Sequence, residues 1–151
     1  LIVVRTFSKA FGVAGMRIGY TISNKKIIGY MLSIKPIYEI NAFNMKLVRL
    51  LIKNIKIMKN YVKEVHKGRI MLKNFLNSQN IEMIGKYSNT VLFKLENKQK
   101  VDHVIKYLFK KKFIVRPMTI DNDDRYIRAT LGSSKIMKKF IGKLKIALKF
   151  N

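Results

Sequence analysis

The sequence predicts an α/β fold, and three observations lead to this prediction. The chain opens on an unbroken apolar run, Leu1–Val4, which is typical of a strand buried on both faces of a parallel sheet. Apolar residues then recur with the period of a helix between Ala42 and Ser78. From Thr90 onward, strand-like and helix-like patterns alternate. A chain of 151 residues is long enough for one or two small domains of this kind.

A loop, a second strand and a short helix are expected after the first strand. Residues 7–15 contain glycines and read as a loop. Apolar residues alternate with small or polar ones over Arg17–Ser23, which predicts a strand. Lys25–Ser33 is expected to be a short helix that Pro36 ends, because the residue before a proline avoids the helical region. Residues 35–41 then form an extended loop.

The middle of the chain predicts two amphipathic helices. The first begins at Ala42, and the second runs from about Met58 to Ser78, with lysines on the outer face of each. Because the second helix is long, we expect it to join two parts of the molecule. The residues expected to face inward are Phe43, Leu47, Leu50, Leu51 and Ile55 in the first helix, and Tyr61, Val65, Leu72 and Leu76 in the second.

The last third of the chain predicts a small α/β unit of three strands and two helices. Pro117 is expected to end the second strand, and residues 121–124 are expected to form a turn. The strands are predicted over Thr90–Leu95, Lys112–Arg116 and Tyr126–Thr130, and the helices over Val101–Phe109 and from Ser134 to Leu148.

The net charge of +24 raises the possibility of a nucleic-acid partner. However, 25 of the 32 basic residues are lysines, and they are spread along the whole chain. Specific readers of nucleic acid rely more on arginine forks and stacked aromatic rings. No cysteine is present, which excludes disulfides and thiolate metal sites, and no signal peptide or membrane-spanning run is recognised. A cytoplasmic location is therefore expected.

A lysine and an arginine follow the first strand in an arrangement that suits a carbonyl cofactor with a phosphate group. Lys9 is placed at a strand end, where partial desolvation would leave its amine neutral often enough to attack a carbonyl carbon. Arg17 offers a guanidinium fork for a phosphate, and Thr6 and Ser8 supply hydroxyls. The glycines around Arg17 let the backbone approach a ligand. A lysine that simply extends from a strand end into solvent is the alternative explanation of Lys9.

The stretch Ser8–Tyr20 reads Ser-Lys-Ala-Phe-Gly-Val-Ala-Gly-Met-Arg-Ile-Gly-Tyr. It resembles the cofactor-lysine motif of fold type I aminotransferases of classes I and II, which depend on pyridoxal 5'-phosphate. It is most similar to the histidinol-phosphate aminotransferases and their relatives, which include threonine-phosphate decarboxylases. The resemblance implies that Lys9 forms the internal aldimine with the cofactor and moves a proton during the reaction. It also implies that Arg17 and Ser8 hold the cofactor phosphate, with Thr6 as a weaker candidate.

The resemblance extends to the end of the chain. Residues 35–41, with Tyr38, are similar to a Pro-Tyr loop near the family's active site, although Ile37 interrupts the usual adjacency. Tyr126–Gly132 resembles the strand whose arginine, here Arg128, grips the substrate's carboxylate or phosphate. Arg116 resembles the second substrate-anion arginine of the histidinol-phosphate group. An ordinary surface arginine is the alternative for each.

The resemblance also implies a domain layout. Residues 1–57 would be the C-terminal part of the large cofactor-binding domain, 58–80 a linking helix, and 81–151 the small C-terminal α/β domain. In this family, the carboxylate partner of the cofactor's ring nitrogen and the glycine-serine phosphate cradle precede the lysine, whereas the first acidic residue here is Glu39. We therefore expect a fragment, about the C-terminal half of a homodimeric enzyme, with little or no transamination by itself.

The expected function is transfer of an amino group between an amino acid and a keto or phosphorylated substrate, with pyridoxal 5'-phosphate as the cofactor. A decarboxylase of the threonine-phosphate type on the same scaffold is one alternative. A basic module that binds nucleic acid or anionic lipid is another. No metal site is expected, because His66 and His103 have no third ligand at a suitable spacing.

Overall fold

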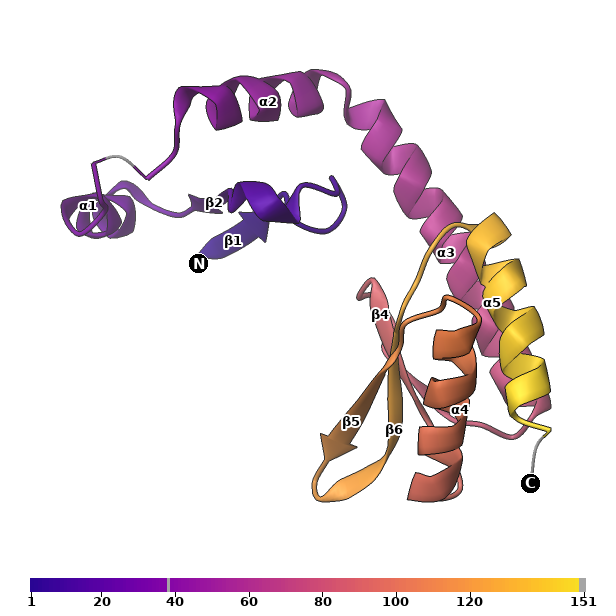
Figure 1. The fold of residues 1–151 in the computed structure, drawn as a ribbon. Helices are drawn as coiled ribbons and strands as arrows, with labels where there is room; N and C mark the ends of the chain where they lie inside the picture. The colour runs from indigo at the N-terminus through magenta and orange to yellow at the C-terminus, as the bar shows by residue number, and fades with distance from the viewer. Residues whose placement is uncertain (38, 150–151) are drawn as a thin grey trace. The chain divides into compact units, whose positions relative to one another are not determined.

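The computed structural model describes residues 1–37 and 39–149. Over these residues the chain forms five α-helices and two small antiparallel sheets, which confirms the predicted α/β class. The chain divides into a first unit, Leu1–Val62, and a second unit that begins at Lys63, and each is described by itself (Figure 1). The domain limits expected from the sequence, at residues 57 and 80, stay a prediction.

The first unit opens with a two-stranded sheet and continues with helices. A short 3₁₀ turn, Ala14–Met16, lies in the loop between the two strands. The strands are β1 (Val3–Thr6) and β2 (Gly19–Ile22), and the helices are α1 (Lys25–Ser33), α2 (Ala42–Lys53) and the first turns of α3 (Ile55–Ser78).

Asparagines define where the first two helices begin. The side-chain oxygen of Asn24 accepts a hydrogen bond from the backbone N–H of Ile27 at 2.9 Å, and that of Asn41 accepts one from Asn44 at 2.8 Å. Each cap satisfies an N–H group that has no partner inside its helix. The predicted bounds of α1 are confirmed, and α2 starts at the predicted residue.

The prediction that the first strand is buried in a parallel sheet is wrong. β1 pairs antiparallel with β2, begins at Val3 rather than Leu1, and leaves Val4 with 70% of its surface exposed. In the part of the chain that the structure describes, no third strand joins this sheet. The apolar side chains that a larger sheet would bury therefore stay exposed, as do the outer edges of both strands.

The inward faces of the two long helices differ in part from the prediction. In α2, Phe43 and Leu50 are exposed, at 71% and 56%, and Asn44 and Val48 are half-buried instead. The predicted inward residues Leu47 and Leu51 are half-buried as well, so the covered stripe is shifted along the helix surface rather than reversed, because neighbouring residues decide which part of a broad apolar stripe is covered. In α3, Leu72 is confirmed as fully buried, together with Leu76 one turn later.

The second unit is a four-stranded sheet with helices on one of its faces. The order of the strands is β3–β4–β6–β5, and every neighbouring pair is antiparallel. Figure 1 shows α4, α5 and the end of α3 on the same side of this sheet. The elements are β3 (Met83–Ile84), which the sequence analysis did not predict, β4 (Thr90–Lys94), α4 (Lys98–Lys110), β5 (Arg116–Ile120), β6 (Asp123–Thr130) and α5 (Ser134–Ala147).

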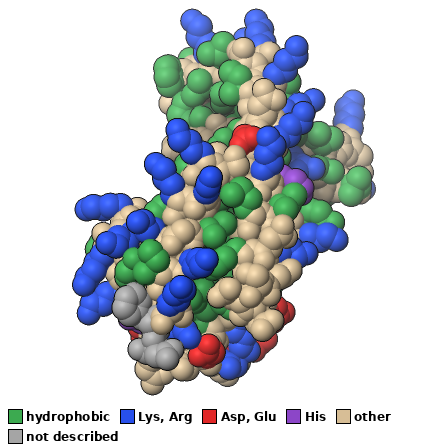
Figure 2. Space-filling view, turned by 90° about the vertical axis from the view of Figure 1, so that its right-hand side faces the viewer, with side chains coloured by type: hydrophobic (Ala, Val, Ile, Leu, Met, Phe, Trp, Pro, Cys, Tyr) green, Lys and Arg blue, Asp and Glu red, His purple; other side chains and the backbone are tan. Residues whose placement is uncertain are grey.

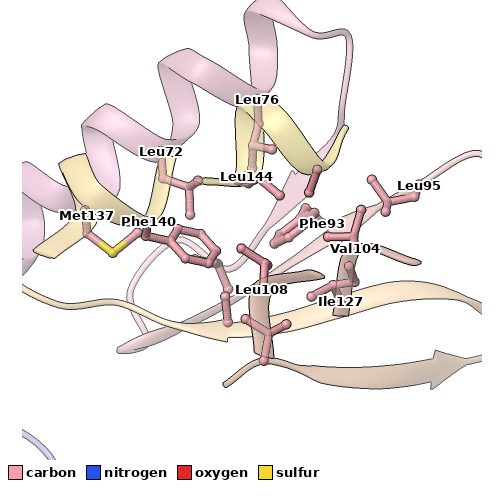
Figure 3. Close-up of a cluster of buried hydrophobic side chains, with 14 of the residues drawn as sticks. Leu72, Leu76, Phe93, Leu95, Val104, Leu108, Ile127, Met137, Phe140 and Leu144 are labelled. Atoms are coloured by element: carbon pink, nitrogen blue, oxygen red, sulfur yellow. The ribbon is translucent and has the colours of Figure 1, made fainter. Parts of the chain in front are cut away.

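The core of the second unit lies between the sheet and its helices (Figure 3). Leu72 of α3, Phe93 of β4, Leu108 of α4, Ile127 of β6 and Leu144 of α5 all have no exposed surface. Complete burial of side chains of this size contributes about 1.5–3 kcal/mol each. This core therefore holds the strands that carry Arg116 and Arg128.

The strand predicted over Lys112–Arg116 is displaced toward the C-terminus. β5 begins at Arg116 and contains Pro117, which was expected to end the strand. Within the described part of the chain, β5 is an edge strand that pairs only with β6, so a proline there leaves the ladder largely intact. The hairpin then turns at Asp121 and Asn122, whose φ angles of +48° and +63° match a two-residue turn that favours these residue types.

Gly19 pairs with Thr6 in the small sheet and leaves no room for a side chain. A Cβ at this position would lie 2.5 Å from the carbonyl oxygen of Arg5. We expect Gly19→Ala to lower the free energy of unfolding by about 1–3 kcal/mol, because the two strands must move apart. Thermal unfolding followed by circular dichroism measures the change. Gly29→Ala in α1 is the control, since nothing lies within 4 Å of its added Cβ; equal effects would contradict the prediction.

Asp123 accepts the hydrogen bonds of a small ion-pair cluster at the start of β6. Its two carboxylate oxygens accept from Nε and Nη2 of Arg125, each at 2.8 Å, and Nζ of Lys94 lies 2.7 Å from one of them. These bonds, with those from Arg125 foremost, hold the pKa of Asp123 well below its ordinary value. The carboxylate therefore stays charged into strongly acidic solution.

This cluster predicts a pH-dependent contribution to stability. An aspartate in an unfolded chain titrates near a pKa of about 3.9, so a lower folded pKa stabilises the fold above that pH. The stabilisation is lost as the pH falls toward the folded pKa. We expect Asp123→Asn to lower Tm at pH 7 and the difference from the wild type to shrink between pH 5 and pH 2. Asp124→Asn is the control, and a difference independent of pH would contradict the assignment.

Candidate active site

The stretch between β1 and β2 folds as a turn on an aromatic anchor. Phe7 is only 4% exposed, and its ring centroid lies 4.9 Å from that of Phe11 and 5.8 Å from that of Tyr20. Above this cluster, the backbone N–H of Gly12 donates to the carbonyl of Lys9 at 3.0 Å. Gly12 has a φ of +72°, a conformation that favours glycine. The buried ring of Phe7 therefore anchors the turn that carries Lys9.

Lys9 lies at the edge of a pocket of about 310 Å³ within the first unit. The turn forms one wall, and the end of α2 with the start of α3 forms the other. The walls are mostly apolar, and the amide of Asn54 and the phenol of Tyr61 are the uncharged polar side chains among them. The residues that line the pocket are Lys9, Ala10, Phe11, Gly12, Leu51, Asn54, Ile57, Met58 and Tyr61.

The side chain of Lys9 is exposed, contrary to the expectation of partial desolvation. That expectation depended on a buried strand end, whereas β1 is largely exposed in the small sheet. The strands that the structure describes therefore do not desolvate the amine of Lys9.

Thr6 and Ser8 form a local hydrogen-bonded pair at the end of β1. Oγ1 of Thr6 donates to Oγ of Ser8 at 2.8 Å and accepts from the backbone N–H of Ser8 at 3.1 Å. Oγ1 of Thr6 also lies 3.3 Å from the carbonyl oxygen of Ile18, a longer and competing acceptor for its single proton. When that proton goes to Ser8, the proton of Ser8 is left for another acceptor. In that arrangement the pair offers an oriented hydroxyl donor next to Lys9.

Arg17 lies just before β2 rather than inside the predicted strand. It ends the 3₁₀ turn with a φ of +52°, and its side chain is exposed. Its Nη1 lies 3.5 Å from the carbonyl oxygen of Ala14, at the outer limit of a hydrogen bond. No carboxylate among the described residues forms an ion pair with Arg17. The guanidinium is therefore available to an anion such as a phosphate ester.

The functional groups of Lys9, Ser8 and Arg17 match the groups of pyridoxal phosphate. A lysine amine beside a pocket suits the aldehyde, and a hydroxyl with a guanidinium suits the phosphate. A Cβ added at Gly12 or Gly15 would meet nothing within 4 Å, so the space beside the turn is open. No carboxylate for the cofactor's ring nitrogen is found among the residues described as lining the pocket.

Arg116 and Arg128 are direct cross-strand partners in the second unit. Opposite residues of an antiparallel pair point to the same face, with Cβ atoms about 4.5–5.5 Å apart. The neighbours of Arg128 in β6, Ile127 and Ala129, are buried under the helices, so both arginines lie on the other, exposed face. Neither has an ion-pair partner within residues 1–37 and 39–149. Like charges at this spacing repel each other, which favours binding of an anion between them.

The predicted site residues therefore form two groups. Thr6, Ser8, Lys9 and Arg17 belong to one turn of the first unit, and the two cross-strand arginines belong to one ladder of the second. Tyr38, which the family resemblance places near the active site, lies outside the described residues.

Two further contributors were missed by the sequence analysis. Nδ2 of Asn44 donates to the carbonyl of Met16 at 3.2 Å, which ties α2 to the turn before Arg17. Arg69 is 8% exposed and donates from its guanidinium to the carbonyls of Gly85 and Ser88. Both polar residues fall on the inward stripe of an amphipathic helix, and this position is the sequence feature that could have identified them.

The face of the molecule shown in Figure 2 has no single stripe of basic side chains that would suit a polyanion. Figure 2 shows Lys and Arg side chains scattered over the visible face, with hydrophobic side chains between them. Among the described residues, no helix is long and apolar enough to cross a membrane. The same residues contain no cluster of three or more histidines or acids that could hold a metal ion.

Comparison with known proteins identifies relatives along nearly the whole chain. The sequence profile described as aminotransferase class I and II matches residues 1–144. The histidinol-phosphate aminotransferase of Methanocaldococcus jannaschii is 33% identical over 144 residues, which cover 93% of this chain and 38% of that protein.

Solved structures show the same fold. The histidinol-phosphate aminotransferase of Sinorhizobium meliloti, in complex with pyridoxal-5'-phosphate, superposes with a TM-score of 0.82 at 19% identity, over 98% of this chain and 41% of that one. The L-threonine-O-3-phosphate decarboxylase of Porphyromonas gingivalis superposes with a TM-score of 0.75 at 19% identity, over 99% of this chain and 47% of that one. At these identities the likeness concerns the fold alone.

The chain spans about two fifths of the length of the curated relatives that it matches. The matching profile nevertheless covers both units, including the turn with Lys9 and the ladder with the two cross-strand arginines. The chain therefore belongs to the class I and II aminotransferase family.

Proposed function

We propose that this chain is part of a pyridoxal-phosphate-dependent aminotransferase that moves an amino group between an amino acid and a keto or phosphorylated substrate. The observation that carries the proposal is the position of Lys9, at a pocket edge in one turn with Ser8 and Arg17. A relative named histidinol-phosphate aminotransferase, at 33% identity, supports the substrate class. Homodimeric assembly and a cytoplasmic location of the whole enzyme belong to the same proposal.

Each residue of the turn has a distinct role in this proposal. When bound, pyridoxal phosphate supplies an aldehyde carbon and a ring that withdraws electrons from the reacting substrate carbon. Lys9 holds the cofactor at the pocket edge through Nζ, and the same amine moves a proton to and from the substrate. Ser8 donates its hydroxyl proton to the phosphate, and Arg17 donates its guanidinium N–H groups. Thr6 orients the hydroxyl of Ser8.

Arg116 and Arg128 are proposed to bind the acidic group of the substrate. Two adjacent guanidinium forks match the oxygens of a phosphate or a carboxylate. A doubly charged phosphate balances two positive charges more fully than a single carboxylate does. The pair therefore favours a phosphorylated substrate, with a carboxylate as the weaker ligand.

Removing one of these arginines is expected to weaken substrate binding. In Arg128→Ala, loss of the charged hydrogen bonds should raise the Kd for histidinol phosphate by about 10- to 100-fold. The free energy of unfolding should rise slightly, because one like-charge repulsion is removed. Calorimetric titration measures the first effect and thermal unfolding the second. Arg49→Ala, an exposed arginine of α2, is the control, and equal Kd values for the two variants would contradict the assignment.

The function is tested first by covalent labelling. The chain is mixed with equimolar pyridoxal phosphate, reduced with borohydride and mapped by mass spectrometry. We expect about one label per chain, located on Lys9. Labels distributed over many of the 25 lysines would overturn the proposal. If nucleic acid binds with a steep salt dependence and Lys9 is unlabelled, the basic-module alternative is favoured instead.

The type of reaction is tested by product analysis. A 2-oxo acid with histidinol phosphate reports amino transfer, whereas carbon dioxide released from phosphothreonine reports decarboxylation. For the 151-residue chain alone we expect little or no turnover, because the described pocket lining offers no carboxylate to the cofactor's ring nitrogen. The assay therefore requires the complete enzyme, in which amino transfer is the expected reaction.

A further inference from the structure

The backbone at Arg17 has a conformation that its surroundings must maintain. A φ of +52° is unfavourable for a residue with a side chain, by roughly 1–2 kcal/mol. Among the described residues, the side chain of Arg17 makes one hydrogen bond, which is at the outer limit of length, 3.5 Å from Nη1 to the carbonyl oxygen of Ala14. The direction of the guanidinium therefore depends on how the preceding peptide group is held.

The peptide group between Met16 and Arg17 is held at both of its ends. Its N–H, on Arg17, donates to the carbonyl of Ala14 at 3.4 Å. Its carbonyl, on Met16, accepts from Nδ2 of Asn44 at 3.2 Å, a contact between residues 28 apart in the sequence. The hydrogen bond to Ala14 is long, so the hydrogen bond from Asn44 fixes the plane of this peptide group more firmly.

Asn44 is itself well placed to impose this constraint. It lies in the first turn of α2, and its backbone N–H donates to the capping oxygen of Asn41 at 2.8 Å. Its side chain is half-buried beside the turn. A carbonyl can only accept, so the amide group must present its nitrogen to Met16.

We propose that Asn44 is a positioning residue for Arg17, and that through Arg17 it orients the phosphate-binding end of the site. The inference rests on the proposed function, in which Arg17 binds the cofactor phosphate. Asn44 does not touch the cofactor in this proposal. Its effect should therefore be confined to ligands that carry the phosphate.

The main test compares pyridoxal phosphate with pyridoxal, which lacks the phosphate. Asn44→Asp replaces the donor by an acceptor of the same shape that repels the Met16 carbonyl. We expect the Kd for pyridoxal phosphate to rise about five- to tenfold, which corresponds to the loss of the one hydrogen bond from Asn44 to the Met16 carbonyl. The Kd for pyridoxal should change less than about twofold. Asn60→Asp, an exposed residue of α3, controls for the added charge.

A second variant guards against a folding defect. Asn44→Ala removes the donor and favours the helix, and it is combined with Arg17→Ala in a double-mutant cycle. If Asn44 acts through Arg17, Asn44→Ala should have no further effect on the Kd for pyridoxal phosphate once Arg17 is gone. Additive losses, or equal losses for both ligands, would overturn the inference.

A cofactor-free measurement separates this inference from the proposed function. Hydrogen exchange of the Arg17 amide, followed by NMR in the chain alone, should be faster in Asn44→Ala than in the wild type. Unchanged exchange would overturn the positioning role whatever the cofactor does. Failure of wild-type Lys9 to take up the cofactor would overturn the proposed function, while the exchange result would still decide the role of Asn44.

Discussion

Replacing Lys9 with alanine is expected to abolish covalent attachment of pyridoxal phosphate to this chain. The borohydride-fixed label should fall from about one per chain to none, because Lys9 is the lysine among the residues described as lining the pocket. Phosphate binding by Ser8 and Arg17 should persist, so some reversible affinity for the cofactor remains. The absorbance of the bound cofactor and the mass of the reduced chain both measure the effect.

The control for this variant is another exposed lysine in the same unit. Lys26, in α1, does not line the pocket, and Lys26→Ala should keep the full label. Since 25 lysines are present, pyridoxal phosphate can also react with surface amines at high concentration, and the titration must stay near one equivalent. A label that survives in Lys9→Ala at this ratio would show that the assignment of Lys9 is wrong.

Replacing Arg69 with methionine is expected to be the most damaging change in the second unit. The guanidinium of Arg69 donates to the carbonyls of Gly85 and Ser88, and only 8% of the residue is exposed. Methionine fills similar space but leaves both carbonyls without a donor, and hydrogen bonds to a charged group contribute about 1.5–3 kcal/mol each. We expect the free energy of unfolding to fall by about 3 kcal/mol or more, measured by urea denaturation.

The matching control is Lys73→Met on the exposed side of the same helix. It removes one positive charge and adds one methionine, so it reproduces the change in composition without the buried contacts. The expected change there is within about 0.5 kcal/mol, as is usual for surface positions. A comparable loss in both variants would mean that the buried hydrogen bonds of Arg69 do not stabilise the loop before β4.

Much of the local structure could be predicted from the sequence. The bounds of α1, the start of α2, the strand at Thr90 and the turn at Asp121 depend on caps, periodicity and turn chemistry among residues a few positions apart. The turn that carries Ser8, Lys9 and Arg17 was likewise recognisable as a candidate site, because its residues are contiguous. These features are local, so a short window of sequence contains them.

The errors arose where distant residues decide the outcome. The first strand was predicted to be buried because its apolar run resembles a strand covered on both faces, yet burial depends on which other strands lie beside it. Pro117 was expected to end a strand because an isolated proline removes a donor, yet an edge position tolerates that loss. In both cases the effect of the residue pattern depends on which strands lie beside it, and a local stretch of sequence does not contain that information.

The sequence by itself determined the α/β class, the family and the candidate lysine with its phosphate-binding neighbours. Only the tertiary structure placed Arg116 opposite Arg128, joined Asn44 to the peptide group before Arg17 and buried Arg69 beneath a loop. The physical reason is that strand register and long-range hydrogen bonds depend on the packing of the whole chain. Such contacts join residues that no local pattern connects.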